Sequence, residues 1–439
     1  MYSPFGQLPE QKDVRRRSLR SSTHEILLAL TATVVTLPVF AQQGIPLTLA
    51  EAEDLALAAE PGQQAMQAKA AALKERAVVA GELPDPLLRV GLNNFPIESG
   101  GFRTEGMTHA AVGLRQAFPA GKTRSFKARQ FDLLAVEMND NADARGRNVL
   151  TAVRSAWLDL YYWEQARALV SESRPLFDDL AIVTRSLYSV GRKSQQDVLR
   201  AELELSRLDD RLIDIERQRA RAQAALSEWV GHNAGRRVAQ KLPNWGQLPL
   251  LKSLEGTLPD HPALRAADAQ IQARGAGVDV AKQRSKPEWA LDLGYSYREG
   301  MLPSGEPRSD FISLGVSVDL PFFSKKSVDS TLSAALQERR AAESSREQTL
   351  RALRSQLAAE HARWKDLTRR LSLYDTRILS LAAINAEASM LAYQSDRGDF
   401  ADVMRAYIDD LNTRIDHIRL QVERAQSYAV LANLGGLPE

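Results

Sequence analysis

The chain of 439 residues has no cysteine, 26% charged residues and only 6% aromatic residues. The missing cysteine excludes disulfide bonds and the acylated N-terminal cysteine of a bacterial lipoprotein, and the few aromatics argue against one large compact core. Ala, Leu, Glu, Arg and Gln dominate instead, which is typical of long helices or coiled coils. The net charge of +2 is not gathered into a basic surface, so we predict no nucleic-acid binding.

The N-terminus predicts export. A basic segment that ends at Arg20 precedes an apolar run over residues 26–40, which closes on the small residue Ala41. This order is typical of a secretory signal peptide, and the run is too short to favour a membrane anchor. We therefore expect residues 1–41 to be a signal peptide that is cleaved after Ala41.

Two helical segments open the mature chain. Thr48, with Glu51 three residues later, predicts an N-cap and a capping box at the start of the first helix. Pro61 separates this helix from a second one, which ends before Pro84 and Pro86 because the residue before a proline is driven out of the helical conformation.

A β-hairpin is predicted next, with arms over about 87–95 and 109–118. Apolar side chains alternate with polar or small ones along both arms, and a polar, Gly-rich loop joins them. Two isolated strands are marginally stable in water. The arm length does suit a tilted membrane-spanning strand, so the hairpin predicts a membrane part.

The helical pattern then continues without a break from Lys122 to Tyr188, with apolar residues at heptad-type spacing. A helix of that length measures about 100 Å at ~1.5 Å per residue, more than one compact domain needs. Pro175 is a candidate kink. The pattern stops at Val190-Gly191 and resumes after Ser194, which predicts a long helical hairpin.

The same order of elements then returns. A helix-poor connector over 232–260 is followed by strands at about 289–298 and 310–320 and by a second long helical hairpin, which turns near 394–400. A tandem duplication explains this order. We therefore divide the mature chain into a first repeat (42–231), a connector (232–260) and a second repeat (261–439).

Sequence motifs that would indicate catalysis, nucleotide binding or metal binding are weak. Gly121-Lys122-Thr123 imitates a phosphate-binding loop, but Gln116 stands where that motif requires glycine. No two histidines have the helical spacing of a metal site, and no nucleophile elbow or catalytic carboxylate pair is visible. The sequence thus predicts no catalytic residue, no cofactor and no metal site, so we expect no enzyme.

From Leu47 to Gly436 the chain resembles the TolC-like outer-membrane efflux family. The resemblance rests on the duplication, the two hairpins, the opening Leu47–Ala52, and Tyr188 and Gly191 ahead of Asp197-Val198-Leu199. Four segments are similar to the heavy-metal branch, which serves copper and silver or cobalt, zinc and cadmium export: Leu83-Pro84-Asp85-Pro86, Gly91-Leu92-Asn93-Asn94-Phe95-Pro96, Gly106-Met107-Thr108 and Leu320-Pro321-Phe322-Phe323.

This resemblance implies a mainly α fold with a small β part. Three copies would form a homotrimer in the outer membrane, each giving four strands to a shared twelve-stranded β-barrel in contact with lipid. Their long helices would form an α-barrel duct in the periplasm. The connector and the segments near both termini would form an equatorial belt around that duct.

The resemblance also implies partners at the periplasmic tips of the helical hairpins: a periplasmic adaptor protein and, bound to it, a proton-driven inner-membrane pump. Its candidate adaptor-contact or aperture residues are Val190, Gly191, Ser194, Asp197, Val198, Gly398, Asp402 and Val403. Asp402, with Asp197, is a candidate for a ring of carboxylates at the aperture. The second tip departs from the first, with Ser395-Asp396-Arg397 in place of Val190-Gly191-Arg192.

The predicted function is thus an outer-membrane channel of a tripartite efflux system, a passive exit duct for heavy-metal cations. A duct for organic drugs or for a type I secretion system remains an alternative, because the pump selects the substrate. An exported periplasmic coiled-coil scaffold is an alternative of another class.

Overall fold

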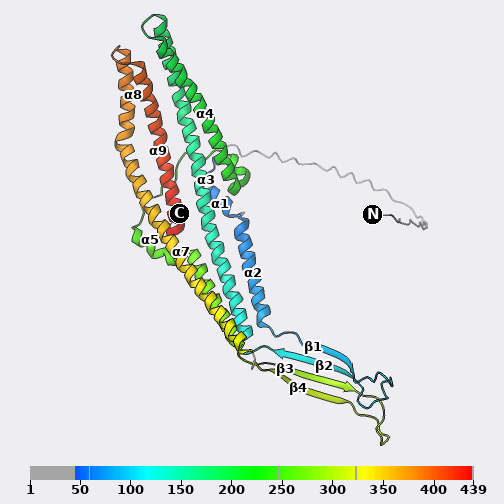
Figure 1. The fold of residues 1–439 in the computed structure, drawn as a ribbon. Coiled ribbons are helices and arrows are strands. Elements are labelled where there is room, and N and C mark those ends of the chain that lie inside the picture. Colours follow the sequence, from blue (N-terminus) through cyan, green and yellow to red (C-terminus); the bar gives the residue numbers. More distant parts are fainter. Residues whose placement is uncertain (1–44, 59, 246–247, 322–323, 438–439) are drawn as a thin grey trace, which may run out of the picture. The chain divides into compact units, whose positions relative to one another are not determined.

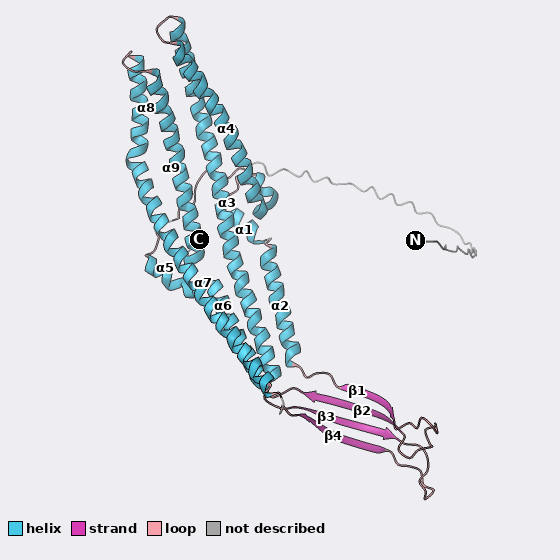
Figure 2. Cartoon of the chain, viewed as in Figure 1, coloured by secondary structure: helices cyan, strands magenta, loops and turns pink. Residues whose placement is uncertain are grey.

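The computed structural model describes residues 45–58, 60–245, 248–321 and 324–437, and their arrangement is shown in Figure 1. The predicted signal peptide and its cleavage site after Ala41 lie outside the described residues. The described part consists of long helices and one four-stranded sheet (Figure 2), the mainly α fold with a small β part that was expected. None of the described helices is both long and apolar enough to cross a membrane.

The first half folds into two helices, a β-hairpin and a long helical hairpin. Its elements are α1 (Leu49–Ala58), α2 (Pro61–Gly81), β1 (Leu87–Asn93), β2 (His109–Phe118), α3 (Thr123–Ser189) and α4 (Gln195–Val230). With 67 residues, α3 is about 100 Å long at ~1.5 Å per residue. Pro175 lies inside α3 without ending it.

The second half repeats this order. Its elements are α6 (Pro262–Gln283), β3 (Glu288–Tyr297), β4 (Phe311–Asp319), α7 (Lys325–Leu373), a π-helical turn (Tyr374–Ile378), α8 (Leu379–Gln394) and α9 (Phe400–Gly435). Because the π-helical turn joins α7 to α8 directly, the two helices form one long arm, which is the counterpart of α3.

The connector contains more helix than the sequence suggested. Helix α5 (Leu251–Thr257) lies in it, between two 3-10 turns (Gly231–Gly235 and Leu258–Asp260). Leu254 and Leu258 are buried in an apolar cluster with Leu357 and Leu431. These partners are far away in the sequence, so local composition could not reveal the helix.

One antiparallel sheet in the order β1-β2-β3-β4 unites the two hairpins. Strand β2 pairs with β3, from Ala110 opposite Tyr297 to Phe118 opposite Trp289. Strands β1 and β4 are the edges of the sheet. All four strands begin and end within two residues of the predicted ones.

The largest buried cluster lies along the long helices. It draws residues from α1, α3, α4 and α9, and its largest members include Trp157 and Phe177 of α3 and Phe400 of α9. Small and β-branched residues such as Val149, Val153 and Ala201 fill the spaces between the helices. The heptad-type apolar spacing therefore corresponds to a real packing surface.

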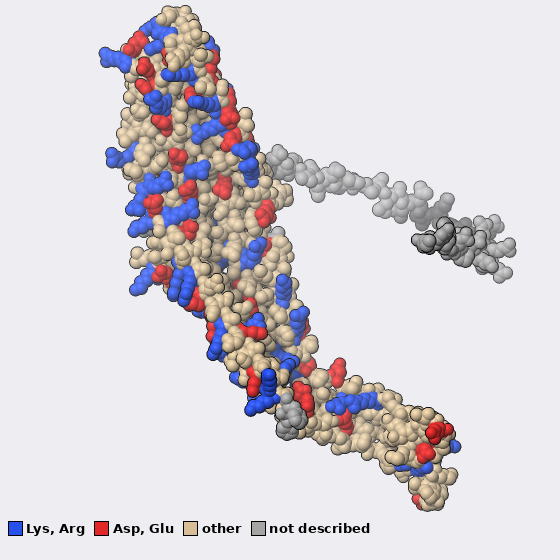
Figure 3. All heavy atoms as spheres, viewed as in Figure 1, with Lys and Arg blue, Asp and Glu red and all other residues tan. Residues whose placement is uncertain are grey.

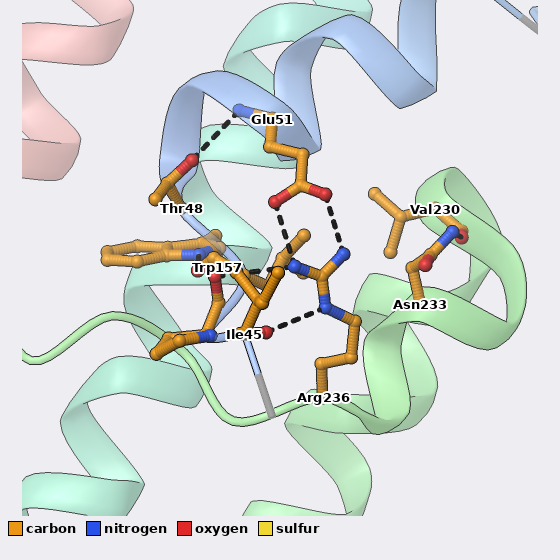
Figure 4. Close-up of polar contacts among 9 residues, drawn as sticks. Ile45, Thr48, Glu51, Trp157, Val230, Asn233 and Arg236 are labelled. Carbon is orange, nitrogen blue, oxygen red and sulfur yellow. Dashed lines mark hydrogen bonds and ion pairs between the residues drawn. The ribbon is translucent and has the colours of Figure 1, made fainter. Parts of the chain in front are cut away.

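The start of the described chain is hydrogen-bonded to the connector (Figure 4). Leu47 forms a parallel bridge with Val238, and the Trp157 indole donates a hydrogen bond of 3.0 Å to the Leu47 carbonyl. Thr48 caps α1 by accepting from the Glu51 N–H at 3.2 Å. The predicted capping box is only half formed, because the Glu51 carboxylate instead accepts from Arg236 at 2.6 and 3.0 Å. These hydrogen bonds lower the pKa of Glu51 below its usual range.

Candidate functional site

The turn between α3 and α4 ends the first helical hairpin, at the end that lies away from the sheet (Figure 1). Gly191 adopts a φ of +75°, which only glycine adopts at little cost. Its N–H donates to the Tyr188 carbonyl at 2.9 Å, and the Arg192 N–H donates to the Leu187 carbonyl at 2.9 Å. The glycine predicted at this tip therefore ends α3.

The turn between α8 and α9 has the same backbone pattern, although its sequence differs. Asp396, at the place of Gly191, adopts a φ of +55°. The Asp396 N–H donates to the Tyr393 carbonyl at 3.2 Å and the Arg397 N–H to the Ala392 carbonyl at 2.8 Å. Aspartate tolerates this left-handed conformation better than most residues, so the sequence departure leaves the turn geometry intact.

An ion-pair cluster joins the two tips. Arg192 Nη2 lies 2.5 Å from Asp396 Oδ2, and Lys193 Nζ lies 3.3 Å from Asp396 Oδ1. Lys193 Nζ also lies 4.4 Å from the centre of the buried Tyr393 ring. The hydrogen bonds from Arg192 and then Lys193 hold the pKa of Asp396 below its usual range. Sequence reasoning missed these contacts, and its one signal was that Asp396 replaces a glycine.

A groove of about 340 Å³ lies beside this cluster, between α3 and α8. Asp179, Arg192, Gln394 and Asp396 supply its polar lining. Its apolar lining consists of Leu176, Leu180, Val183, Leu187, Met390 and Tyr393. An apolar groove between charged groups suits an amphipathic helical partner.

Two candidates of the first tip, Ser194 and Asp197, cap the start of helix α4. Ser194 and Asp197 form a full capping box: the Ser194 hydroxyl accepts from the Asp197 N–H at 3.3 Å, and the Asp197 carboxylate accepts from the Ser194 N–H at 3.2 Å. Asp197 therefore has a structural role that explains its position. Val190 is exposed, and Val198 is half-buried.

The candidates of the second tip differ in exposure. Asp402 is exposed and pairs with Arg405 at 2.9 Å. Gly398 lies so close to the end of α8 that a Cβ would stand 3.2 Å from the Tyr393 nitrogen. Val403 is fully buried in the main cluster. Its side chain is therefore unavailable as a contact on the protomer surface, because the apolar face of α9 turns it inward.

The sheet has one apolar face. By register, Leu88, Leu114, Leu293 and Leu314 form one row across the four strands. The next row toward the loops holds Val90, Val112, Tyr295 and Ile312. These side chains are exposed, and aromatic residues stand near both ends: Phe118 stacked on Trp289 at 4.1 Å beside the helices, and Tyr295 and Tyr297 beside the loops. An apolar band between aromatic girdles is typical of a lipid-facing surface.

The opposite face of the sheet carries mostly polar or small residues. One row aligns Arg115 with Asp292 and Gly315, and the next aligns Gly113 with Gly294 and Ser313. Arg115 Nη1 lies 3.6 Å from Asp292 Oδ1, and the Ser317 hydroxyl donates to Asp292 Oδ2 at 2.9 Å. Figure 3 shows one side of the molecule, on which Lys, Arg, Asp and Glu are dense over the helices and sparse over the sheet.

Comparison with known proteins agrees with this architecture. Residues 254–437 match the family model of the outer membrane efflux protein. Protein CyaE of Bordetella pertussis is 25% identical over 418 residues, which cover 89% of this chain and 84% of the relative.

Solved structures share the fold over most of the chain. The outer-membrane channel OprN matches with a TM-score of 0.73 at 17% identity, covering 89% of this chain and 90% of its own. The outer membrane protein VceC of Vibrio cholerae matches with a TM-score of 0.73 at 16% identity, over 88% and 96% of the two chains. The MtrE outer membrane channel of Neisseria gonorrhoeae gives 0.70 at 17% identity, over 88% of each chain. Residues 254–437 are therefore similar to the outer membrane efflux protein family, and the chain has the fold of these solved outer-membrane proteins over most of its length.

Proposed function

We propose that three copies of this chain form the outer-membrane channel of a tripartite efflux system. The observation that carries this proposal is the sheet: four strands with an apolar face, a polar face and two unpaired edges. Four strands cannot close on themselves, and lipid offers no hydrogen bonds to open edges. Three copies supply twelve strands, enough for a barrel with a water-filled lumen.

The tips of the helical hairpins are the proposed docking site for the periplasmic adaptor, which connects the channel to a proton-driven inner-membrane pump. The groove between α3 and α8 supports this role because it is apolar and lies next to both turns. The contact candidates that remain on the surface or in the turns are Val190, Gly191, Ser194, Val198 and Gly398.

Such a channel performs no covalent chemistry, and its substrate moves passively through the duct. Asp402 is the candidate for an aperture ring, because it is exposed and, in a trimer, would be repeated around the axis. Asp197 is the weaker candidate, because its carboxylate is engaged in the capping box. Val403 we assign to packing.

We propose heavy-metal cations as the substrate, on the sequence similarity to that branch. Deleting the gene tests this proposal: the strain should become sensitive to copper, silver, cobalt, zinc or cadmium salts, and expression of the wild-type chain should restore resistance. Sensitivity to organic drugs alone, or loss of a secreted polypeptide alone, would instead support the alternative cargoes.

Membrane fractionation separates the channel from an exported coiled-coil scaffold. We expect the mature protein in the outer-membrane fraction, as an oligomer that dissociates on a denaturing gel only after heating. Recovery in the soluble periplasmic fraction as a heat-insensitive monomer would overturn the proposal.

A further inference from the structure

The two edge strands carry opposite charges on the polar face of the sheet. Arg89 of β1 shares a row with Gly113, Gly294 and Ser313, and Asp319 of β4 shares one with Glu288. Both side chains are exposed. Within the described residues, neither forms an ion pair or a side-chain hydrogen bond, whereas Arg115 and Asp292 on the inner strands of the same face are paired.

A second copy of this chain is the partner that these edges fit. Strand edges in a membrane need a hydrogen-bonding partner. Strands β1 and β4 run in opposite directions, because each pair of neighbours in the sheet is antiparallel. A contact between β4 of one copy and β1 of the next therefore continues the antiparallel pattern. This step rests on the proposed trimer.

The strand ends favour one register for that contact. The row that begins at Leu87, the first residue of β1, passes through Arg115 and Asp292 to Gly315. Gly315 lies four residues (315 to 319) before Asp319, the end of β4 beside the helices. If the helix-side ends of both strands are matched, Leu87 of the next copy lies opposite Asp319. The row of residues that starts at Leu87 is then displaced by four residues along β4 on passing from one copy to the next, and we call this displacement the stagger. The opposite stagger would align Leu87 with Phe311 and leave the rest of β1 unpaired.

This stagger satisfies the geometry of a closed barrel. A stagger of four residues per copy gives a total stagger of about twelve residues over the twelve strands of three copies. With a rise of ~3.3 Å per residue and a strand spacing of ~4.8 Å, the strand tilt is about 35°, at the lower end of the usual range. A stagger of six residues per copy would tilt the strands by about 46°.

The geometry points to an ion pair between Arg89 of one copy and Asp319 of the next, on the channel-facing side of each junction. With a stagger of four, Arg89 stands opposite Ser317 and diagonal to Asp319, about 7–8 Å away and within reach of a long side chain. With a stagger of six, the two residues stand directly opposite. The pair closes the ring of strands and neutralises two charges that the protomer leaves open.

Cysteine pairs test the register, because the chain has no native cysteine. We expect R89C/S317C to form disulfide-linked dimers and trimers in oxidised outer membranes if the stagger is four, and R89C/D319C to do so if it is six, because a disulfide requires positions directly opposite each other. The matched control R89C/S313C should remain unlinked, because the same register separates those positions by about 13 Å, beyond disulfide reach. Linkage in the control alone, or in none of the three, would overturn the inference.

A charge swap tests the ion pair itself. R89D and D319R should each lower the temperature at which the trimer dissociates in detergent, and R89D/D319R should restore it. A bifunctional amine-reactive reagent on the wild-type protein keeps the two proposals apart. If it yields no trimer, the proposed function fails. If it yields a trimer but the double swap restores nothing, only the ion pair fails.

Discussion

Arg192 and Asp396 form an ion pair although 204 residues separate them in the sequence. One belongs to the turn of the first helical hairpin and the other to the turn of the second. Lys193 adds a second cation to the same carboxylate. The tips of the two repeats are thus tied to each other by side chains and not by packing alone.

Removing the shared carboxylate should loosen the tips. Asp396→Asn leaves Arg192 and Lys193 without their anionic partner, so we expect a higher single-channel conductance in planar bilayers and less closure under voltage. Asp409→Asn removes an equal, exposed charge from α9 and is the matched control, with unchanged conductance. If both variants behave like the wild type, the ion pair does not restrain the tips.

Much of the fold is readable from the sequence because it follows local periodicity. The alternation of Leu88, Val90 and Leu92 with polar or small residues gives β1 its two faces, and heptad-type spacing gives α3 its buried side. The order of elements repeats, so identifying one hairpin identifies the other. Helix α5 was missed because its burial depends on Leu357 and Leu431.

The side-chain contacts at the hairpin tips were harder to predict from the sequence. The positive φ of Asp396 and its partners depend on how two distant turns meet, and no local pattern encodes that meeting. Asp197 was read as a candidate contact, whereas its spacing from Ser194 is also that of a capping box. Val403 was among the contact candidates that the resemblance implied, but the apolar face of α9 makes it a core residue.

Asp402 should act on selectivity more than on closure. It is exposed, and its ion-pair partner among the described residues is Arg405 on its own helix, so Asp402→Asn leaves the Arg192–Asp396 contact in place. If three copies line the aperture, loss of these charges should lower the preference for cations over anions, measured as a shift in reversal potential across a salt gradient. Arg405→Gln, which leaves Asp402 unpaired, should shift the potential the other way. Unchanged potentials in both variants would remove Asp402 from the aperture.

The two faces of the sheet should respond differently to charge. Leu314→Lys places an ammonium on the apolar face, where a charge near the middle of the bilayer costs about 2–4 kcal/mol. Ser313→Lys, one residue away, places it on the polar face. We expect Leu314→Lys to reduce the amount of heat-modifiable oligomer in the outer membrane while Ser313→Lys assembles normally. Equal yields would contradict the assignment of the faces.

Arg236 should fix the start of the described chain. Its guanidinium donates to the Glu51 carboxylate and to the Ile45 carbonyl, the latter at 3.0 Å. Arg236→Ala removes these hydrogen bonds, and because water can replace the guanidinium at partly exposed acceptors the loss is about 0.5–1.5 kcal/mol per bond. We expect faster proteolysis near residues 45–48 in the detergent-solubilised protein. Arg237→Ala, at the exposed neighbouring position, is the control and should be cleaved at the wild-type rate.

His261 should make stability depend on pH. It caps α6, and its Nδ1 accepts from the Ala263 N–H at 3.2 Å. Burial, and then the nearby Arg147, lower the pKa of His261 below the ordinary value of 6.5. The unfolded chain therefore takes up a proton at a higher pH than the folded chain does. The free energy of unfolding should accordingly fall as the pH drops below about 6.5 and level off below the folded-state pKa.

His261→Asn tests this dependence, because asparagine caps a helix without titrating. We expect its thermal unfolding midpoint, followed by circular dichroism in detergent, to change less between pH 7 and pH 5 than that of the wild type. His232→Asn, at an exposed histidine, should retain the wild-type dependence. If His261→Asn loses as much stability as the wild type over this range, the dependence arises from other groups, and the neutral cap at α6 is not its cause.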